Sequence, residues 1–311
     1  HTALRRQRQM CIRDRNSTIA RKLVCRLIPD LVSGNSLENL ITAKLDYGLL
    51  DDPRNDVSVR LNSTVINVQN NKSAGGTVTV SYVRDNQLEK VSASKCILAC
   101  NSNVIPFICP ELPDKQKEAL AFQVKVPILY TNVAVKNWEA WKNLGIGAMV
   151  CPGSYHIVSM LDFPVTYGNY EFSRNEREPI VIHMERFPHS YGSNLSAREQ
   201  YKLGRYELLT TPFETIERNV REQLESSLSE GGFNAAKDIL GITVNRWSHG
   251  YSYWYNPLFD PIYDDYNDSR YPHIIGRKKY GNITIANADS AANAMLESAI
   301  EEAYRAVSEL I

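Results

Sequence analysis

Two spacings of apolar residues divide the chain into predicted strands and helices. Alternation of apolar and polar residues over short segments bounded by Gly, Asn and Asp predicts a β-meander in the first third of the chain, and later runs that are almost wholly apolar predict buried strands. The predicted strands cover 57–67, 77–84, 91–100, 126–135, 180–186 and 282–286.

Helical spacing predicts a helix over 19–31, a short one over 138–144, one that begins at Pro212, and a final one from about Asn293. The helix at Pro212 is the clearest, because an apolar stripe runs along it until Gly231-Gly232. Thr211 and Glu214 predict a reciprocal cap at its start. The stripes are Ile19, Leu23, Leu27 and Leu31; Phe213, Ile216, Val220, Leu224 and Leu228; and Leu296, Ile300, Ala303, Val307 and Leu310.

The first fifteen residues do not resemble the rest. Arg5 to Asp14 back-translates into a DNA-library adapter, so residues 1–15 are predicted to be an artefact and the native sequence to enter at about Asn16. The whole chain of 311 residues has 35 basic and 35 acidic residues. Without this arginine-rich run it is mildly acidic, which argues against a nucleic-acid partner. No apolar run is long enough to predict an integral membrane segment.

Cysteine usage predicts neither a disulfide framework nor a zinc site. The number after Asn16 is odd and no paired C-x-x-C motif occurs. No metal site is predicted.

The segment 281–299 carries the most informative chemistry. A predicted strand delivers Asp289 to a turn of small residues that leads into the last helix. A carboxylate there can accept hydrogen bonds from sugar or ribityl hydroxyls, and the helix start offers amides and positive potential to a planar ligand. An ordinary capped helix after a core strand is the alternative from this segment alone.

This segment resembles the carboxy-terminal FAD signature of the flavin-containing amine oxidoreductases. The resemblance implies that Asp289 contacts the ribityl chain and that the amides of Ala294 and Met295 meet the pyrimidine edge of the flavin. The chain departs from the family in having Ala288 where a glycine often precedes the acid.

Two further segments resemble the same family. In 61–68, Val65 would contact the adenine through its backbone, and in 95–101, the residues Ala99, Cys100 and Asn101 would return to the flavin. The family's G-x-G-x-x-G phosphate loop does not occur in the sequence, and it is expected upstream of Asn16. Other stretches, among them 16–24, 178–184, 211–215 and 244–259, are similar to bacterial spermidine-dehydrogenase-like proteins.

The aromatic segment 247–255 is the predicted substrate side. As a strand it would place Trp247, Tyr251, Tyr253 and Tyr255 on one face and Trp254 on the other, where rings can flank an alkylamine and attract a distal ammonium. A tyrosine-rich core strand is the alternative. His249 can be structural or a base, and no catalytic residue is assigned.

These observations predict an α/β fold with α+β character: a partial FAD-binding Rossmann-like domain from 16–104 and 271–311, and a mixed-sheet substrate domain over 105–270. The resemblance implies an FAD-dependent oxidoreductase that oxidises a small-molecule amine, including a polyamine such as spermidine, by hydride transfer to flavin. An FAD-dependent desaturase of the same fold and a non-catalytic remnant are the alternatives. The electron acceptor, the oligomeric state and the compartment stay open, periplasmic if a twin-arginine signal precedes the sequence and cytoplasmic otherwise.

Overall fold

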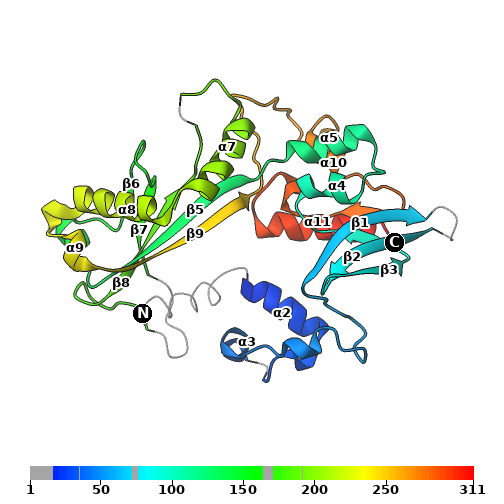
Figure 1. Ribbon diagram of the computed structural model, residues 1–311, viewed down its shortest axis with the longest axis horizontal. Helices are drawn as coiled ribbons and strands as arrows, with labels where there is room; N and C mark the ends of the chain where they lie inside the picture. The colour runs from blue at the N-terminus through cyan, green and yellow to red at the C-terminus, as the bar shows by residue number, and fades with distance from the viewer. Residues whose placement is uncertain (1–16, 35, 72–75, 164–170, 191) are drawn as a thin grey trace. The chain divides into compact units, whose positions relative to one another are not determined.

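The computed structural model describes residues 17–34, 36–71, 76–163, 171–190 and 192–311. They form two compact units, and most of their helices and strands are labelled in Figure 1. Unit 1 comprises His1–Arg60, Pro127–Pro188 and Gly204–Ser248, and unit 2 comprises Leu61–Val126, His189–Leu203 and His249–Ile311. Both units combine helices and strands, so the predicted α/β fold is confirmed.

The boundaries of the units do not coincide with the predicted domain boundaries at 104/105 and 270/271. The division into an FAD-binding and a substrate domain therefore stays a prediction. The predicted adapter residues 1–15 lie outside the described residues.

A five-stranded sheet in the order β6-β7-β8-β5-β9 lies at the centre of unit 1. Neighbours from β6 to β5 pair antiparallel. The predicted strands over 126–135 and 180–186 are confirmed. The strands are β5 (Val126–Val135), β6 (Ala148–Val150), β7 (Val158–Asp162), β8 (Ile180–Arg186) and β9 (Ile239–Tyr251).

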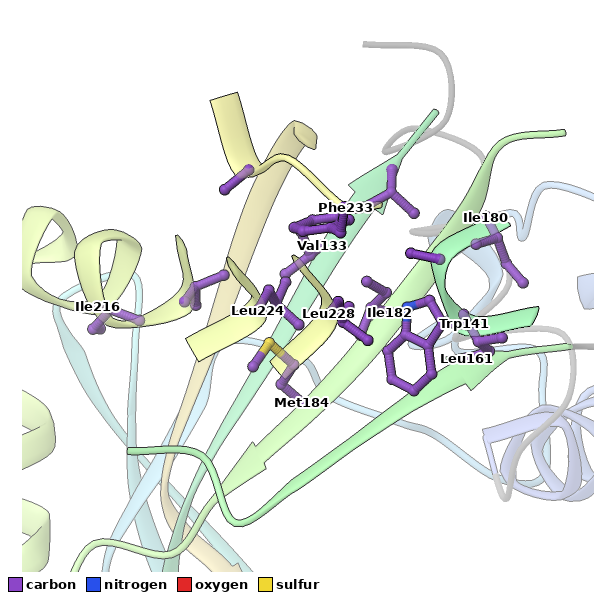
Figure 2. Close-up of a cluster of buried hydrophobic side chains, with 14 of the residues drawn as sticks. Val133, Trp141, Leu161, Ile180, Ile182, Met184, Ile216, Leu224, Leu228 and Phe233 are labelled. Atoms are coloured by element: carbon purple, nitrogen blue, oxygen red, sulfur yellow. The ribbon is translucent and has the colours of Figure 1, made fainter. Parts of the chain in front are cut away.

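Helix α8 (Phe213–Leu228) packs on one face of this sheet (Figure 2). Its predicted stripe is buried from Ile216 onward, while Phe213 is exposed. Burial of this stripe against apolar strand residues stabilises the unit. The shared core contains Ile216, Val220, Leu224, Leu228, Val133, Ile182, Met184 and Trp141.

The predicted cap of α8 is wrong. Pro212 is the residue before the helix, and no side chain caps the first turn. The Thr211 hydroxyl instead donates to the Glu207 carbonyl at 2.8 Å, which closes the preceding helix α7 (Ala197–Thr210). The Thr211 side chain thus bonds to the helix before it and not to the first turn of α8, which the local sequence does not reveal.

The predicted helix over 19–31 is divided. α2 (Ser17–Leu27) ends before Ile28, and a 3₁₀ turn covers Pro29–Leu31. Proline removes an amide and disfavours helical geometry in the residue before it, which explains the break. Leu31 is buried, whereas Ile19, Leu23 and Leu27 are exposed, so most of the expected stripe does not face a core. The other helices of this unit are α3 (Leu37–Thr42), α6 (Glu139–Leu144) and α9 (Ala235–Asp238).

Unit 2 contains the predicted β-meander as a three-stranded sheet, β1-β2-β3, and a separate parallel pair, β4 and β10. The predicted strand over 91–100 is two strands, because the chain leaves β3 and pairs with β10. The predicted strand over 57–67 begins only at Ser63, after a turn in which Asn62 is left-handed (φ 54°). The strands are β1 (Ser63–Asn71), β2 (Thr77–Arg84), β3 (Gln87–Ala93), β4 (Cys96–Leu98) and β10 (Ile283–Ile285).

Helix α11 (Leu296–Ser308) ends unit 2, and its buried face is not the predicted one. Ile300 and Val307 are exposed, whereas Glu302 and Ala306 are buried and Leu310 is buried just beyond the helix end. The arginines that pair with Glu302 explain why this other face of α11 is buried, as described below. The other helices of the unit are α4 (Ile105–Ile108), α5 (Asp114–Phe122) and α10 (Pro272–Gly276).

Candidate functional site

The strand, turn and helix predicted at 281–299 are present in unit 2. β10 leads into a 3₁₀ turn over Ala288–Ala291, and Ala292 is left-handed (φ 45°) before α11 begins. Asn287 holds the turn, because its Oδ1 accepts from the Ser290 amide at 2.8 Å and its Nδ2 donates to the Cys100 carbonyl at 2.5 Å. The turn therefore adjoins the residues that follow β4.

Parallel pairing of β4 and β10 brings most of the residues predicted to contact flavin to one edge. Ala99, Cys100 and Asn101 are exposed directly after β4, beside the turn that contains Asp289. Val65 lies instead on β1 in the three-stranded sheet, next to a register shift between Val65 and Asn67. The structure thus collects three of these residues around Asp289 and leaves Val65 in a different sheet.

Asp289 is fully buried and both of its oxygens have protein partners. Oδ1 lies 2.6 Å from Lys125 Nζ, and Oδ2 accepts from the Ser102 amide at 3.0 Å. Lys125, itself buried, also donates to the Ser252 hydroxyl at 3.2 Å. The carboxylate would therefore accept a ribityl hydroxyl only through a lone pair that these partners leave, or after Lys125 withdraws. The predicted ribityl contact stays a prediction.

The start of α11 is more open than Asp289 to a planar ligand, for which a contact with the pyrimidine edge is predicted here. Ala294 and Met295 are exposed, and no side chain caps the helix at Met295. Helix geometry leaves the first amides without intrahelical partners, so they can donate to acceptor atoms of a ring. The amides at this terminus are thus available to a planar ligand, whereas Asp289 would meet one only after its ion pair with Lys125 rearranges.

Lys125, Gln123 and His273 are buried polar residues that sequence reasoning missed. Gln123 and His273 both contact the Tyr255 hydroxyl, at 3.4 and 2.9 Å. Gln123 Oε1 and His273 Nε2 have no hydrogen-bond partner among the described residues, and both side chains line a crevice, too narrow to hold a water molecule, that Asp289 also lines. Burial, followed by the charge of Arg277, lowers the pKa of His273 to about 4. The one available signal was a lysine directly before the apolar strand 126–135.

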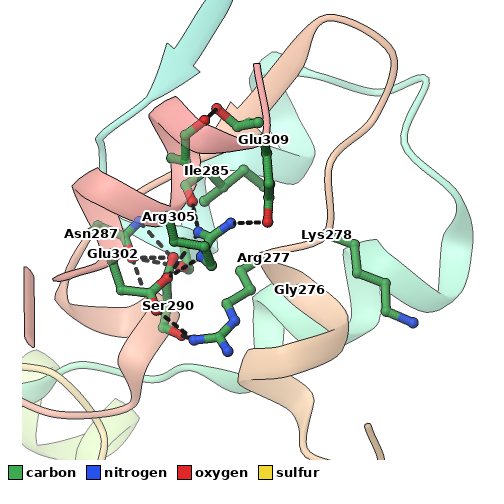
Figure 3. A network of polar contacts seen from close by, with 12 residues as sticks. Gly276, Arg277, Lys278, Ile285, Asn287, Ser290, Glu302, Arg305 and Glu309 are labelled. Atoms are coloured by element: carbon green, nitrogen blue, oxygen red, sulfur yellow. Dashed lines mark hydrogen bonds and ion pairs between the residues drawn. The ribbon is translucent and has the colours of Figure 1, made fainter. Parts of the chain in front are cut away.

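Two arginines hold the turn and α11 together (Figure 3). Arg277 pairs with Glu302 Oε1 at 2.5 Å and donates to the Ser290 carbonyl at 3.2 Å. Arg305 donates to Glu302 Oε2 at 2.9 Å and to the Ile285 carbonyl at 2.5 Å. Glu302 thus links β10, the turn and α10 to one face of α11, and this network orients the helix.

The predicted aromatic face of 247–255 does not form as one strand surface. β9 ends at Tyr251, and Tyr253 is buried in a cluster with Phe122 and Tyr271. The Tyr253 hydroxyl donates to Asp260, and burial raises its pKa. Tyr255 shares that cluster, whereas Trp247, Tyr251 and Trp254 are exposed. Their role toward a substrate stays a prediction.

In the part of the chain that the structure describes, no group of three or more His, Cys, Asp or Glu side chains could hold a metal ion. Within the same residues, no helix is both long and apolar enough to cross a membrane.

No family model and no curated protein matches the chain. It is similar to the solved structure of a putrescine oxidase triple mutant with redesigned cofactor binding, at 13% identity and a TM-score of 0.51, covering 80% of this chain and 48% of that one. It is also similar to cyclohexylamine oxidase from Brevibacterium oxydans IH-35A, at 12% identity and a TM-score of 0.52, covering 79% of this chain and 47% of that one.

The chain thus spans about half the length of the solved structures it matches. Identities this low show the fold alone. The chain has an α/β fold like that of part of these two amine oxidases.

Proposed function

We propose that the chain is part of an FAD-dependent oxidoreductase that oxidises an amine. The observation that carries the proposal is the turn 286–295, in which a buried carboxylate and an open helix start meet the carboxyl ends of two parallel strands. This arrangement occurs in a fold like that of amine oxidases. A polyamine such as spermidine is the finer substrate proposal.

Bound FAD would supply the hydride acceptor. The backbone amides of Ala294 and Met295, directly before α11, would donate to the pyrimidine edge, and the start of the helix would favour negative charge there. Asp289 would hold the ribityl chain if Lys125 yields one of its oxygens. The bonds that Arg277 and Arg305 make with Glu302 would keep the turn and α11 in fixed positions relative to each other.

The decisive measurement is the visible spectrum of the complete gene product, purified and reconstituted with FAD. We expect flavin absorbance that is retained on gel filtration, and anaerobic bleaching of that absorbance when spermidine or another amine is added. Asp289→Asn should weaken FAD retention, whereas Asp114→Asn, at an exposed site on α5, should not. A protein that retains no flavin would refute the proposal, and retention without bleaching by any amine would refute amine oxidation.

A further inference from the structure

The turn before α11 contains an alanine in a conformation that favours glycine. Ala292 is left-handed, with φ 45°. Its amide donates to the Asp289 carbonyl at 2.9 Å, and the Asn293 amide donates to the Ala288 carbonyl at 3.2 Å, so the residue closes the 3₁₀ turn. Glycine is the usual residue at this position of such a cap, because the Cβ of another residue approaches a carbonyl oxygen. The conformation therefore costs free energy that a contact from another segment must offset.

The Tyr266 hydroxyl makes such a contact. It lies 3.0 Å from the Ala291 carbonyl oxygen and 3.0 Å from the Ala292 carbonyl oxygen. A carbonyl oxygen only accepts hydrogen bonds, so the phenol donates its one hydrogen to both. These carbonyls belong to the two planar peptide groups that flank the Ala292 α-carbon, and the orientations of those groups define its φ and ψ angles. One hydroxyl thus holds Ala292 in the left-handed form.

The loop that carries Tyr266 is itself held in place. Tyr271 is buried and joins the two ends of the loop, because its hydroxyl accepts from the Tyr263 amide at 2.8 Å and donates to the Tyr263 carbonyl at 3.2 Å. The centroid of the Tyr266 ring lies 5.0 Å from that of His273 and 5.8 Å from that of Tyr271. These contacts fix the ring, so its hydroxyl can fix the turn.

The held residue lies between the turn and the helix. The loop, the turn and α11 all belong to unit 2. The φ and ψ angles of Ala292 set where the exposed residues Ala294 and Met295 lie relative to the turn. A change at Ala292 would move their amides away from a ligand that is held by the rest of the turn.

We infer that Tyr266 is a positioning residue for the ligand that the amides of Ala294 and Met295 bind. This inference rests on the proposed function, to which it adds a residue outside the segment 281–299. Tyr266 would not touch the ligand, because its hydroxyl acts through the backbone of Ala292.

The effect on the turn can be measured in the 311-residue chain alone. Tyr266→Phe keeps the ring but removes the hydroxyl. We expect the Ala292 and Asn293 amides to exchange hydrogen about fivefold faster, the effect of losing one hydrogen bond. Hydrogen exchange followed by mass spectrometry reports on this segment. Tyr304→Phe, which removes an exposed hydroxyl on α11, is the matched control and should leave the exchange unchanged. Unchanged exchange in Tyr266→Phe would overturn the inference.

Ala292→Gly separates positioning from general packing. Glycine adopts the left-handed form without a steric cost, so it should need the hydroxyl less. In the complete FAD-loaded protein, Tyr266→Phe should weaken FAD binding about fivefold. It should also lower the midpoint potential of the flavin, since displaced amides favour negative charge less. Both effects should be smaller in an Ala292→Gly background. Effects of equal size in the two backgrounds, or unchanged FAD binding and potential, would overturn the inference.

The same measurements distinguish this inference from the proposed function. If the wild-type protein retains no flavin while exchange still depends on Tyr266 and is rescued by Ala292→Gly, the proposed function fails and the hydroxyl still positions the turn. If an amine bleaches the flavin while exchange does not depend on Tyr266, the inference fails and the proposed function stands.

Discussion

The ion pair between Asp289 and Lys125 places two opposite charges where water does not reach. Both side chains are buried; Asp289 also accepts from the Ser102 amide, and Lys125 also donates to the Ser252 hydroxyl. A buried pair contributes little net stability because desolvation offsets the attraction, but loss of one partner strands the other charge. The cost of burying each charge is therefore offset mainly by the other residue and not by its neighbours in the sequence.

Asp289→Asn should lower the free energy of unfolding by about 3–5 kcal/mol, because Lys125 would be left buried without its counter-charge. Urea denaturation at neutral pH measures this. The double variant Asp289→Asn with Lys125→Met should recover much of the loss, since no charge is then stranded. Asp114→Asn, which breaks an exposed pair with Lys117, should change stability little. A single variant as stable as the double one would contradict the account.

Helices α8 and α11 differ in what orients them. In α8 the apolar stripe itself lies against the sheet, with Leu224 and Leu228 fully buried. In α11 the buried Glu302 takes hydrogen bonds from Arg277 and Arg305, and this network turns Ile300 toward solvent. An apolar stripe predicts the buried face of a helix only where the helix does not also bury a charged side chain on another face.

Glu302→Gln should loosen α11 without unfolding the rest of unit 2, because both arginines lose their carboxylate. We expect the α11 amides to exchange hydrogen about ten- to hundredfold faster, the effect of losing charged hydrogen bonds. Hydrogen exchange followed by mass spectrometry resolves this segment. Glu301→Gln changes an exposed neighbour on the same helix and serves as the control. Unchanged exchange in Glu302→Gln would show that the network does not hold the helix.

For the whole molecule, each unit contains a histidine that is buried in its neutral form. In unit 1, burial, then Arg186 and His183, lowers the pKa of His156 to about 3. In unit 2, His273 has a pKa of about 4. Unfolding returns both to an ordinary value near 6.5. The unfolded chain therefore binds more protons below pH 6.5, and acid favours it.

The contribution of these two neutral histidines to the free energy of unfolding should accordingly be fully present above about pH 6.5. It should be lost as the pH is lowered toward 4 and 3. Each histidine contributes a slope that approaches about 1.4 kcal/mol per pH unit. His273→Gln and His156→Gln should each flatten the dependence between pH 6.5 and 5, where carboxylates contribute little. Urea denaturation across this range measures the slopes. A variant slope equal to that of wild type would mean that the histidine is charged in the folded state.

Some elements could be predicted from their residues alone. Strands β5 and β8 and most of helix α8 follow from local apolar patterns, because burial of one face or of a whole strand needs only a core to pack against. The turn around Asp289 was likewise visible as a carboxylate between a strand and a helix. Lys125 was not, because nothing near it in the sequence refers to Asp289.

The sequence by itself therefore determined the α/β class, the principal strands and the strand–turn–helix that suggests a flavin. Only the tertiary structure decided how side chains are shared between distant segments: Thr211 closes α7, Glu302 rotates α11, Tyr253 is buried, and Lys125 neutralises Asp289. The physical reason is the range of the forces involved. Apolar patterns record each element's own burial, whereas a buried polar group is satisfied by whichever partner the fold brings to it.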